Sequence, residues 1–340
     1  MLCETRKKRQ NKKWRQLISF AAFKKCKTHS LSINQNVFNE QKMRAYANEL
    51  KSTELINYIK SRITYPWDEI SKQYFNYVEE AIFGMRLLSK LTLEGRILEV
   101  GSGPGMLVAW LHMNGVNVMG IEPSELGFEF NLQLQNAIWD YYKLPKNLIL
   151  DLIAEDLDSG IHGKFDLVYS VNVIEHLPKD NIQLAFTKIK NVLAEDGMMY
   201  HHCPNYIIPF EPHYGFPLIP MFPQLTGKIK GVANDNLWKS FNFITLPQIK
   251  KVASAISMEV SFQQRAMKDS FLRLEEDKEF AERHTTLVKI YPILKKLGII
   301  NFFGLIPPVL CTPMTYTLLH KGTNSRYNDK GLKISAKQKK

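Results

Sequence analysis

The residues best suited to ligand chemistry lie in a short glycine-rich segment that contains Gly101, Gly103 and Gly105. A strand at 96–100 is expected before it and a helix that opens at about Pro104 is expected after it, so the chain should turn sharply from strand to helix. Glycine permits positive φ angles and close approach to the backbone, and free N–H groups at a helix start favour a carboxylate or phosphate. The segment therefore predicts a ligand-binding loop.

The spacing of these glycines shows which kinds of nucleotide-binding loop the segment can and cannot be. A dinucleotide fingerprint requires Gly-x-Gly-x-x-Gly, but Met106 occupies the third glycine position, and the acidic Glu99 stands where such folds usually place an apolar residue. A P-loop requires a Gly-Lys-Ser or Gly-Lys-Thr sequence, which does not follow here. Neither of these nucleotide sites is expected.

Polar residues stand at the ends of three further predicted strands. The strands and their end residues are 116–121 with Glu122 and Pro123, 148–154 with Glu155 and Asp156, and 165–171 with Asn172. Alternating strands and helices predict a parallel sheet with helices on both faces, and a ligand in such a sheet lies across the carboxyl ends of the strands. These polar side chains are therefore expected around one crevice.

Two motifs carry a resemblance to a known superfamily. The pattern Glu99-x-Gly101-x-Gly103-x-Gly105 resembles the first motif of class I S-adenosylmethionine-dependent methyltransferases. The segment 165–177, FDLVYSVNVIEHL, resembles the fourth-strand signature of small-molecule methyltransferases of the ubiquinone and menaquinone biosynthesis group. The resemblance implies an α/β fold with a Rossmann-like, doubly wound sheet of seven strands, mostly parallel, whose last strand at 314–320 is antiparallel.

The resemblance also implies how S-adenosylmethionine is bound. Glu122 would accept from the ribose hydroxyls, while Asp156 and the Leu157 amide would face the adenine, with Glu155 as the competing acid. The end of the fourth strand would pass beneath the sulfonium. The predicted cofactor-binding residues are Glu99, Gly101, Ser102, Gly103, Gly105, Glu122, Pro123, Asp156, Leu157 and Asn172.

Methyl transfer from a sulfonium is an in-line displacement, for which the protein supplies alignment, a dry pocket and, for a hydroxyl acceptor, a base. His176 is the leading base candidate because it stands just past the fourth strand and can titrate near neutrality. The alternative is a packing and hydrogen-bonding role beside Glu175. His213 is the second catalytic candidate, in an apolar, proline-rich segment that is expected to form a lid.

A second group of possible ligand residues follows the predicted fifth strand at 198–202. It consists of His201, His202, Cys203 and His213. These residue types bind metals, but their adjacency lacks the usual ligand spacing, so no metal site is expected.

The net charge of +12 is concentrated in the two tails. Residues 1–30 carry ten Lys and Arg against one acid, and residues 321–340 carry seven against one, which leaves a net charge of −3 for residues 31–320. A basic face for nucleic acid is therefore not expected on the folded body. Residues 1–30 are expected to be disordered. The alternative is that the basic tails make peripheral contact with an anionic membrane surface.

Four scattered cysteines without CxxC spacing favour a reducing compartment, so the cytoplasm is the expected location, with peripheral placement at a membrane surface as a variant. No uninterrupted apolar stretch is long enough for a transmembrane helix. The expected organisation is a basic tail at 1–30, a helical cap at 31–90, a methyltransferase domain at 91–320 and a second basic tail at 321–340. Within the domain, a lid is expected at 203–242 and a helical excursion at 270–310.

The expected function is methyl transfer to a small-molecule or lipid-like acceptor, most simply at oxygen. The alternatives are a nucleic-acid or protein methyltransferase, or a cofactor-binding module without turnover. The amino-methylating nucleic-acid enzymes carry Asp/Asn-Pro-Pro-Tyr after the fourth strand, whereas this chain has Asn172-Val173-Ile174-Glu175. The Pro-Cys pair of the cytosine-carbon enzymes appears only reversed, as Cys203-Pro204 after the fifth strand, so nucleic acid is not the expected substrate.

Overall fold

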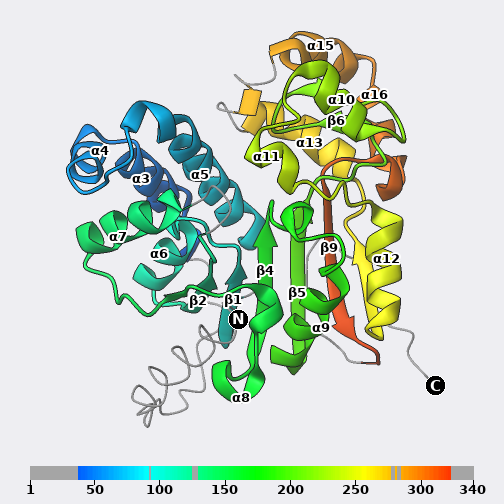
Figure 1. The fold of residues 1–340 in the computed structure, drawn as a ribbon. Helices are drawn as coiled ribbons and strands as arrows, with labels where there is room; N and C mark the ends of the chain where they lie inside the picture. Colours follow the sequence, from blue (N-terminus) through cyan, green and yellow to red (C-terminus); the bar gives the residue numbers. More distant parts are fainter. Residues whose placement is uncertain (1–36, 92, 125–128, 277–279, 282–284, 323–340) are drawn as a thin grey trace.

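The sheet has the predicted architecture. The structure, a computed structural model, describes residues 37–91, 93–124, 129–276, 280–281 and 285–322. Seven strands form one sheet in the order β3-β2-β1-β4-β5-β9-β8 (Figure 1). The parallel strands are β1 (Arg96–Val100), β2 (Asn117–Ile121), β3 (Ile149–Leu150), β4 (Phe165–Val171) and β5 (Leu193–Cys203). β9 (Met314–His320) pairs antiparallel with β5 and with β8 (Met258–Phe262), so the doubly wound α/β sheet with an antiparallel last strand is confirmed.

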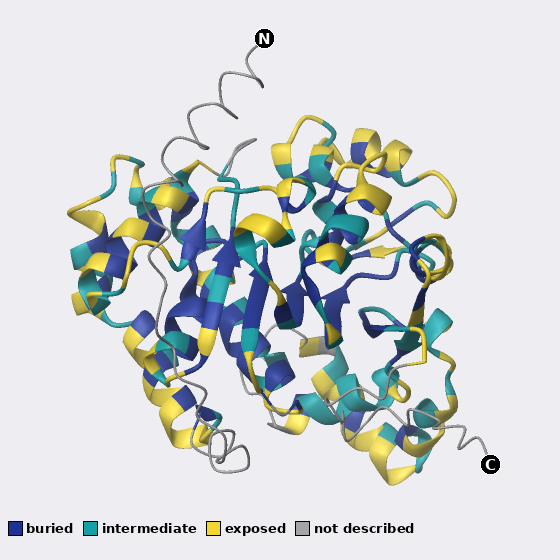
Figure 2. Ribbon diagram, turned by 90° about the horizontal axis from the view of Figure 1, so that it is seen from below, coloured by how far each residue is buried: buried dark blue, intermediate teal, exposed yellow. Residues whose placement is uncertain are grey.

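Helices cover both faces of the sheet because successive side chains of a strand point to opposite sides. Leu167 of β4 belongs to the core on one face, and its neighbour Val168 belongs to the core on the other. The first core includes α5 (Trp67–Leu88), α6 (Met106–Met113) and α7 (Phe130–Tyr142). The second includes α9 (Ile182–Val192) and α12 (Leu246–Ala255). Figure 2 shows the buried strands between the exposed outer surfaces of these helices.

The segment before β1 folds into α3 (Glu40–Leu50), α4 (Thr53–Lys60) and α5. Side-chain caps fix two helix starts: Asn39 accepts from the Gln41 and Lys42 N–H groups, and Ser52 accepts from the Leu55 N–H. The buried Tyr46 Oη donates to the Met106 carbonyl oxygen over 2.8 Å. The N-terminal helices are thus attached to the first turn of α6, directly after the glycine-rich loop.

Two excursions lie beyond the carboxyl ends of the parallel strands, at the upper right of Figure 1. The first, between β5 and α12, contains the short hairpin β6 (Phe210–Glu211) and β7 (Phe216–Pro217), then α10 (Pro223–Lys230) and α11 (Asn236–Ser240). The second, between β8 and β9, contains α13 (Ala266–Glu276), α15 (Thr285–Lys296) and α16 (Ile299–Phe302). We call the first excursion, residues 203–242, the lid.

Three local expectations were wrong. β3 is only two residues long, because it is an edge strand that pairs with β2 alone and the chain then enters the 3-10 helix η1 (Ala154–Asp156). Pro104 does not open α6, because Gly105 adopts φ 74° as the N-cap and the helix begins at Met106. β5 begins at Leu193 rather than at Met198, since it pairs with β4 from its first residue across a register shift.

Among the described residues, no helix combines the length and apolar character that crossing a bilayer requires. The predicted basic tails, 1–30 and 321–340, lie outside the described residues apart from Lys321 and Gly322.

Candidate active site

The glycine-rich loop is held against the end of β2. The N–H groups of Gly101 and Ser102 donate to the Ile121 carbonyl oxygen over 2.9 and 3.1 Å, and Ser102 is buried. Gly101, Gly103 and Gly105 all have positive φ, which side chains rarely tolerate. A Cβ on Gly101 would lie 2.5 Å from a Val173 methyl group, so the loop also touches the segment that follows β4. The predicted loop is therefore closely packed on two sides.

The Glu99 side chain is buried beside this loop. The residue is 5% exposed, and its Oε2 has no hydrogen-bond partner among the described residues. Burial raises the pKa of Glu99 to about 8, and the charges of Glu122 and Glu80 add to the rise, which the nearby Tyr169 hydroxyl opposes. An unsatisfied buried acceptor next to two further acids favours a cationic ligand.

Glu122 reaches from the end of β2 back into the loop. Its Oε2 accepts from the Gly103 N–H over 3.0 Å, and its Oε1 accepts from Asn131 Nδ2 on α7 over 3.2 Å. Burial raises the pKa of Glu122, and these two hydrogen bonds counteract the rise. Pro123, which follows, is half-buried. The arrangement places a carboxylate at the loop, as the resemblance implies for a ribose-binding acid.

The two residues predicted to bind the adenine, Asp156 and Leu157, lie at the end of η1 and directly after it. The Asp156 side chain is exposed, whereas Leu157 is buried and its N–H donates to the Ala154 carbonyl oxygen over 3.3 Å. In this structure the Leu157 amide therefore already has an acceptor. Binding of an adenine nitrogen there would require that hydrogen bond to be exchanged.

Asn172 connects the end of β4 to the N-terminal helices. Its backbone adopts φ 52°, its N–H donates to the His202 carbonyl oxygen over 2.8 Å, and its Nδ2 donates to Glu80 Oε1 on α5 over 3.1 Å. The 3-10 helix η2 (Ile174–His176) follows at once. The geometry places this segment between the glycine-rich loop and the lid.

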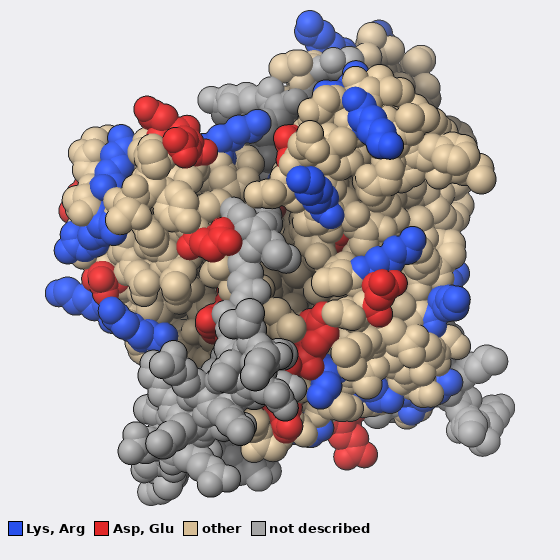
Figure 3. All heavy atoms as spheres, in the orientation of Figure 1, with Lys and Arg blue, Asp and Glu red and all other residues tan. Residues whose placement is uncertain are grey.

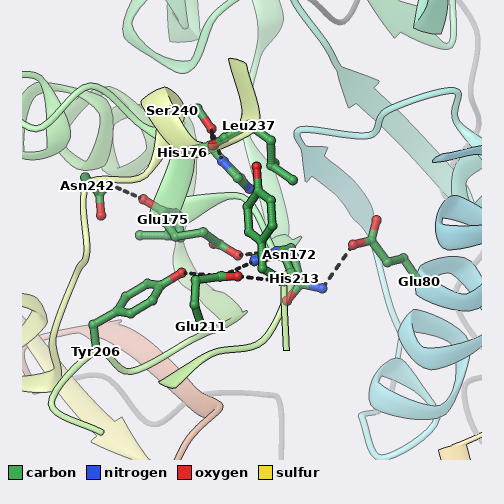
Figure 4. A network of polar contacts seen from close by, with 12 residues as sticks. Glu80, Asn172, Glu175, His176, Tyr206, Glu211, His213, Leu237, Ser240 and Asn242 are labelled. Carbon is green, nitrogen blue, oxygen red and sulfur yellow. Dashed lines mark hydrogen bonds and ion pairs between the residues drawn. The ribbon is translucent and has the colours of Figure 1, made fainter. Parts of the chain in front are cut away.

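A second polar centre joins the end of β4 to the lid (Figure 4). We call it the lid cluster, which consists of Glu175, His176, Glu211 and His213. His213 Nδ1 lies 2.7 Å from Glu211 Oε1, and His213 Nε2 lies 3.9 Å from Glu175 Oε1. Tyr206 Oη donates to Glu211 Oε1 over 3.1 Å, and the Tyr214 N–H donates to Glu211 Oε2 over 2.6 Å. Glu211 is thus a buried carboxylate that is stabilised by these hydrogen bonds and fixes the His213 ring.

The proton positions on the two imidazoles follow from their partners. Ser240 Oγ donates to the Leu237 carbonyl oxygen over 2.7 Å, so it accepts from His176 Nδ1, which lies 2.7 Å away. This leaves the lone pair of His176 on Nε2. Since Glu211 accepts from His213 Nδ1, the His213 nitrogen that faces Glu175 is also Nε2. In each neutral imidazole the basic lone pair is therefore on Nε2.

The same contacts shift the pKa values in opposite directions. Burial, reinforced by the charge of His213, lowers the pKa of His176 to about 3. Burial also disfavours charged His213, but the hydrogen bond to Glu211 and the charges of Glu175, Glu211 and Glu80 outweigh it and raise its pKa. Glu175 is fully buried, neither oxygen has a hydrogen-bond partner among the described residues, and burial raises its pKa to about 8. His213 is therefore the stronger base of the two histidines.

The histidines of β5 have structural partners instead. His201 Nδ1 lies 2.8 Å from Ser170 Oγ, and His202 Nδ1 lies 2.8 Å from Thr315 Oγ1, both inside the sheet, where Cys203 is also buried. The three residues therefore do not join His213 as the sequence grouping suggests. Within the described ranges, possible metal-ligand atoms converge instead at Glu175, His176 and His213, all within 4.8 Å of one another.

Sequence reasoning missed three residues that complete the site. Glu80 on α5 bonds Asn172 and acts electrostatically on Glu99, Glu175 and His213, so it links both polar centres. Asn131 supports Glu122, and Tyr77 lies 3.3 Å from where a Gly103 Cβ would be. No motif spacing marks these residues, because they come from helices that only the fold brings to the loop.

Comparisons with known proteins agree with this geometry. A family model described as "Methyltransferase domain" matches residues 72–250. An uncharacterized protein of Mycobacterium tuberculosis is 30% identical over 234 residues, which cover 66% of this chain and 78% of the relative. A probable fatty acid methyltransferase of the same organism is 28% identical over 122 residues, 34% of this chain and 26% of the relative. A ubiquinone biosynthesis O-methyltransferase of Dechloromonas aromatica is 27% identical over 139 residues, 40% of this chain and 52% of the relative.

Proposed function

Since the chain belongs to the methyltransferase domain family and has the class I sheet, we propose that it methylates a hydroxyl group of a lipid-like acceptor. The single observation that carries the proposal is the pairing of two polar centres at one end of the sheet. One is a glycine-rich loop with buried acids, and the other is a lid histidine oriented by Glu211.

The residues at the loop fit S-adenosylmethionine. This cofactor supplies an activated methyl group on a cationic sulfonium, and it also carries an ammonium group and two ribose hydroxyls. The unpartnered Oε2 of Glu99 would accept from the cationic end, and Glu122 would accept from the ribose. Because both acids have raised pKa values in the free protein, a positive ligand would stabilise their charged forms.

His213 is assigned as the general base in place of His176. A catalytic base works best when its pKa lies near the operating pH, and the pKa of His176, at about 3, is too low. The gap of 3.9 Å between His213 Nε2 and Glu175 Oε1 is too long for a hydrogen bond. An acceptor hydroxyl placed between them would donate its proton to Nε2, and Glu211 would stabilise the resulting imidazolium.

The lid favours an apolar acceptor. Its core contains Leu218, Trp238 and Phe241, and the Phe241 ring lies 5.0 Å from the His213 ring. The ring of His176 lies 5.1 Å from the same phenylalanine. The base is therefore set among aromatic side chains, as a hydrophobic ligand requires. The names of two relatives, a fatty acid methyltransferase and a ubiquinone biosynthesis O-methyltransferase, support an acceptor of this class.

Binding and turnover test different parts of the proposal. Gly103→Arg and Glu122→Ala should weaken S-adenosylmethionine binding in calorimetry, and unchanged affinity in both would contradict the cofactor assignment. Labelled cofactor incubated with fractionated cell extract should label a lipid-extractable product that resists mild base hydrolysis of esters. Label in protein or nucleic acid alone would refute the acceptor class, and binding without any labelled product would favour a module without turnover.

The role of the base is tested by a matched pair of histidine variants. His213→Gln should lower kcat by about 100-fold or more while leaving cofactor affinity unchanged. His162→Gln, on α8 (Ser159–His162), should leave both unchanged because this residue lies outside the lid cluster. If His213→Gln keeps wild-type turnover, His213 is not the base, and a selective loss in His176→Ala would restore the sequence-based assignment.

A further inference from the structure

Large apolar side chains are exposed on the outer faces of two helices. At α10, Phe222, Leu225 and Ile229 follow an i, i+3, i+7 spacing and are 61%, 48% and 67% exposed. Ile293 on α15 and Leu297, which directly follows this helix, are 60% and 64% exposed. Exposed apolar residues continue past α15 with Phe302 and Leu305, and Met221 precedes α10. Single exposed apolar residues are common, but aligned rows of them mark interaction sites.

Both helices already have an inner face that is packed. The inner face of α15 places Tyr291, Leu287 and Leu294 in a core shared with α13. The inner face of α10 places Gly227 so close to the Trp238 ring that a Cβ would lie 2.3 Å from it. The exposed apolar rows are therefore a second apolar face of each helix, in addition to the face that packs against the rest of the protein. A helix that is apolar on both sides is normally covered on both sides.

The charge around these rows distinguishes between the partners that could cover them. Segments 217–234 and 285–312, which carry these rows, contain five lysines (Lys228, Lys230, Lys289, Lys295 and Lys296) and no Asp or Glu. Lys295 pairs with Glu275 of α13, and Lys230 Nζ lies 5.6 Å from the centroid of the Phe216 ring. In Figure 3, Lys and Arg side chains stand among broad uncharged areas on the upper right lobe. This contrasts with a net charge of −3 over residues 31–320.

These rows lie at the functional end of the molecule. α10, α15 and α16 are grouped beyond the carboxyl ends of β4 and β5, which is where the lid cluster is built (Figure 1). α10 and α11 also belong to the same lid that supplies His213 and Ser240. Whatever binds the outer rows therefore approaches the molecule from the side on which an acceptor would enter.

We propose that the outer faces of α10, α15 and α16 bind to an anionic membrane surface. Apolar side chains would enter the boundary between head groups and acyl chains, and the lysines would pair with acidic head groups. A second copy of this chain fits poorly, because it would bring lysines against lysines with no acid in either segment. The binding needs neither cofactor nor acceptor, so its failure would leave the proposed methyl transfer untouched.

The test is co-sedimentation of the full-length protein with vesicles, without cofactor or acceptor. Binding is expected to vesicles of equal parts phosphatidylcholine and phosphatidylglycerol, and to be much weaker to phosphatidylcholine alone. Phe222→Ser with Ile293→Ser should weaken binding about tenfold or more. Lys228→Glu with Lys296→Glu should weaken it about thirtyfold at low salt, because each lysine near an anionic surface contributes separately.

Matched controls come from equally exposed apolar residues elsewhere. Ile161→Ser on α8 and Leu184→Ser on α9, which are 50% and 47% exposed, should bind as the wild type does. Because all of these side chains are exposed, thermal unfolding should show unchanged folding. Wild-type binding by the α10 and α15 variants would overturn the proposal and assign any vesicle binding to the basic tails. Wild-type dimerisation in sedimentation velocity that these variants abolish, without vesicle binding, would assign the surface to a second copy instead.

Discussion

Replacing Glu99 by Gln should stabilise the protein at high pH and weaken cofactor binding at the same time. The carboxyl group is buried, and its pKa lies at about 8 instead of 4.5. An acid whose folded pKa is raised binds its proton more tightly in the folded state, so its stability contribution is complete below pH 4.5 and is lost as the pH rises to about 8. The full shift corresponds to about 5 kcal/mol.

The expected effect follows from that window. Between pH 5 and pH 9, ionisation of Glu99 should remove about 4 kcal/mol from the free energy of unfolding of the wild type, and Gln removes this dependence because it does not titrate. Urea unfolding at both pH values measures it. Glu259→Gln, an exposed acid on β8, is the matched control and should retain the wild-type pH dependence.

Binding should respond in the opposite sense. If Glu99 must be ionised to hold a cationic ligand, wild-type affinity for S-adenosylmethionine should fall up to tenfold for each pH unit below 8, and binding should release a proton. Calorimetry in buffers of different ionisation enthalpy measures that proton. Equal pH dependence of stability in Glu99→Gln and wild type, or proton uptake on binding, would refute the reasoning.

Three further predictions concern the loop and the lid cluster. Gly105→Ala should lower the free energy of unfolding in urea by about 3 kcal/mol, because its Cβ would lie 2.2 Å from Ile149. Gly115→Ala, at φ 81° with nothing within 4 Å, should lower it by about 1 kcal/mol. Equal losses in the two variants would show that packing is not decisive. The acid limb of the kcat–pH profile should lie above pH 6.5, because the pKa of His213 is raised and the base must be neutral, and a limb that persists in His213→Gln would contradict this origin. Zn²⁺ should inhibit turnover reversibly, since ligand atoms of the lid cluster lie within 4.8 Å of one another, and activity that is insensitive to Zn²⁺ would contradict that convergence.

The local sequence pattern predicted the central strands of the sheet better than its edge strand and its helix ends. β1, β4 and β9 have the residues expected from their apolar runs, because central strands need continuous apolar side chains on both faces. β3 was overestimated because an edge strand with one neighbour can end early, and the start of α6 was misplaced because Gly105, not Pro104, adopts the capping conformation. Such ends depend on pairing and on single φ angles that periodicity does not encode.

The sequence by itself determined the glycine-rich loop, the acids at the strand ends and the superfamily, because these depend on residue type and on spacing along one continuous segment. Only the tertiary structure decided which groups act together. Glu80 is hydrogen-bonded to Asn172, which lies 92 positions away in the sequence. His213 contacts Glu175 at the end of β4, whereas His201, which is nearer to it in the sequence, is hydrogen-bonded to Ser170. Burial then separated the two histidines, because pKa depends on the surroundings of a side chain, and those surroundings come from segments distant along the chain.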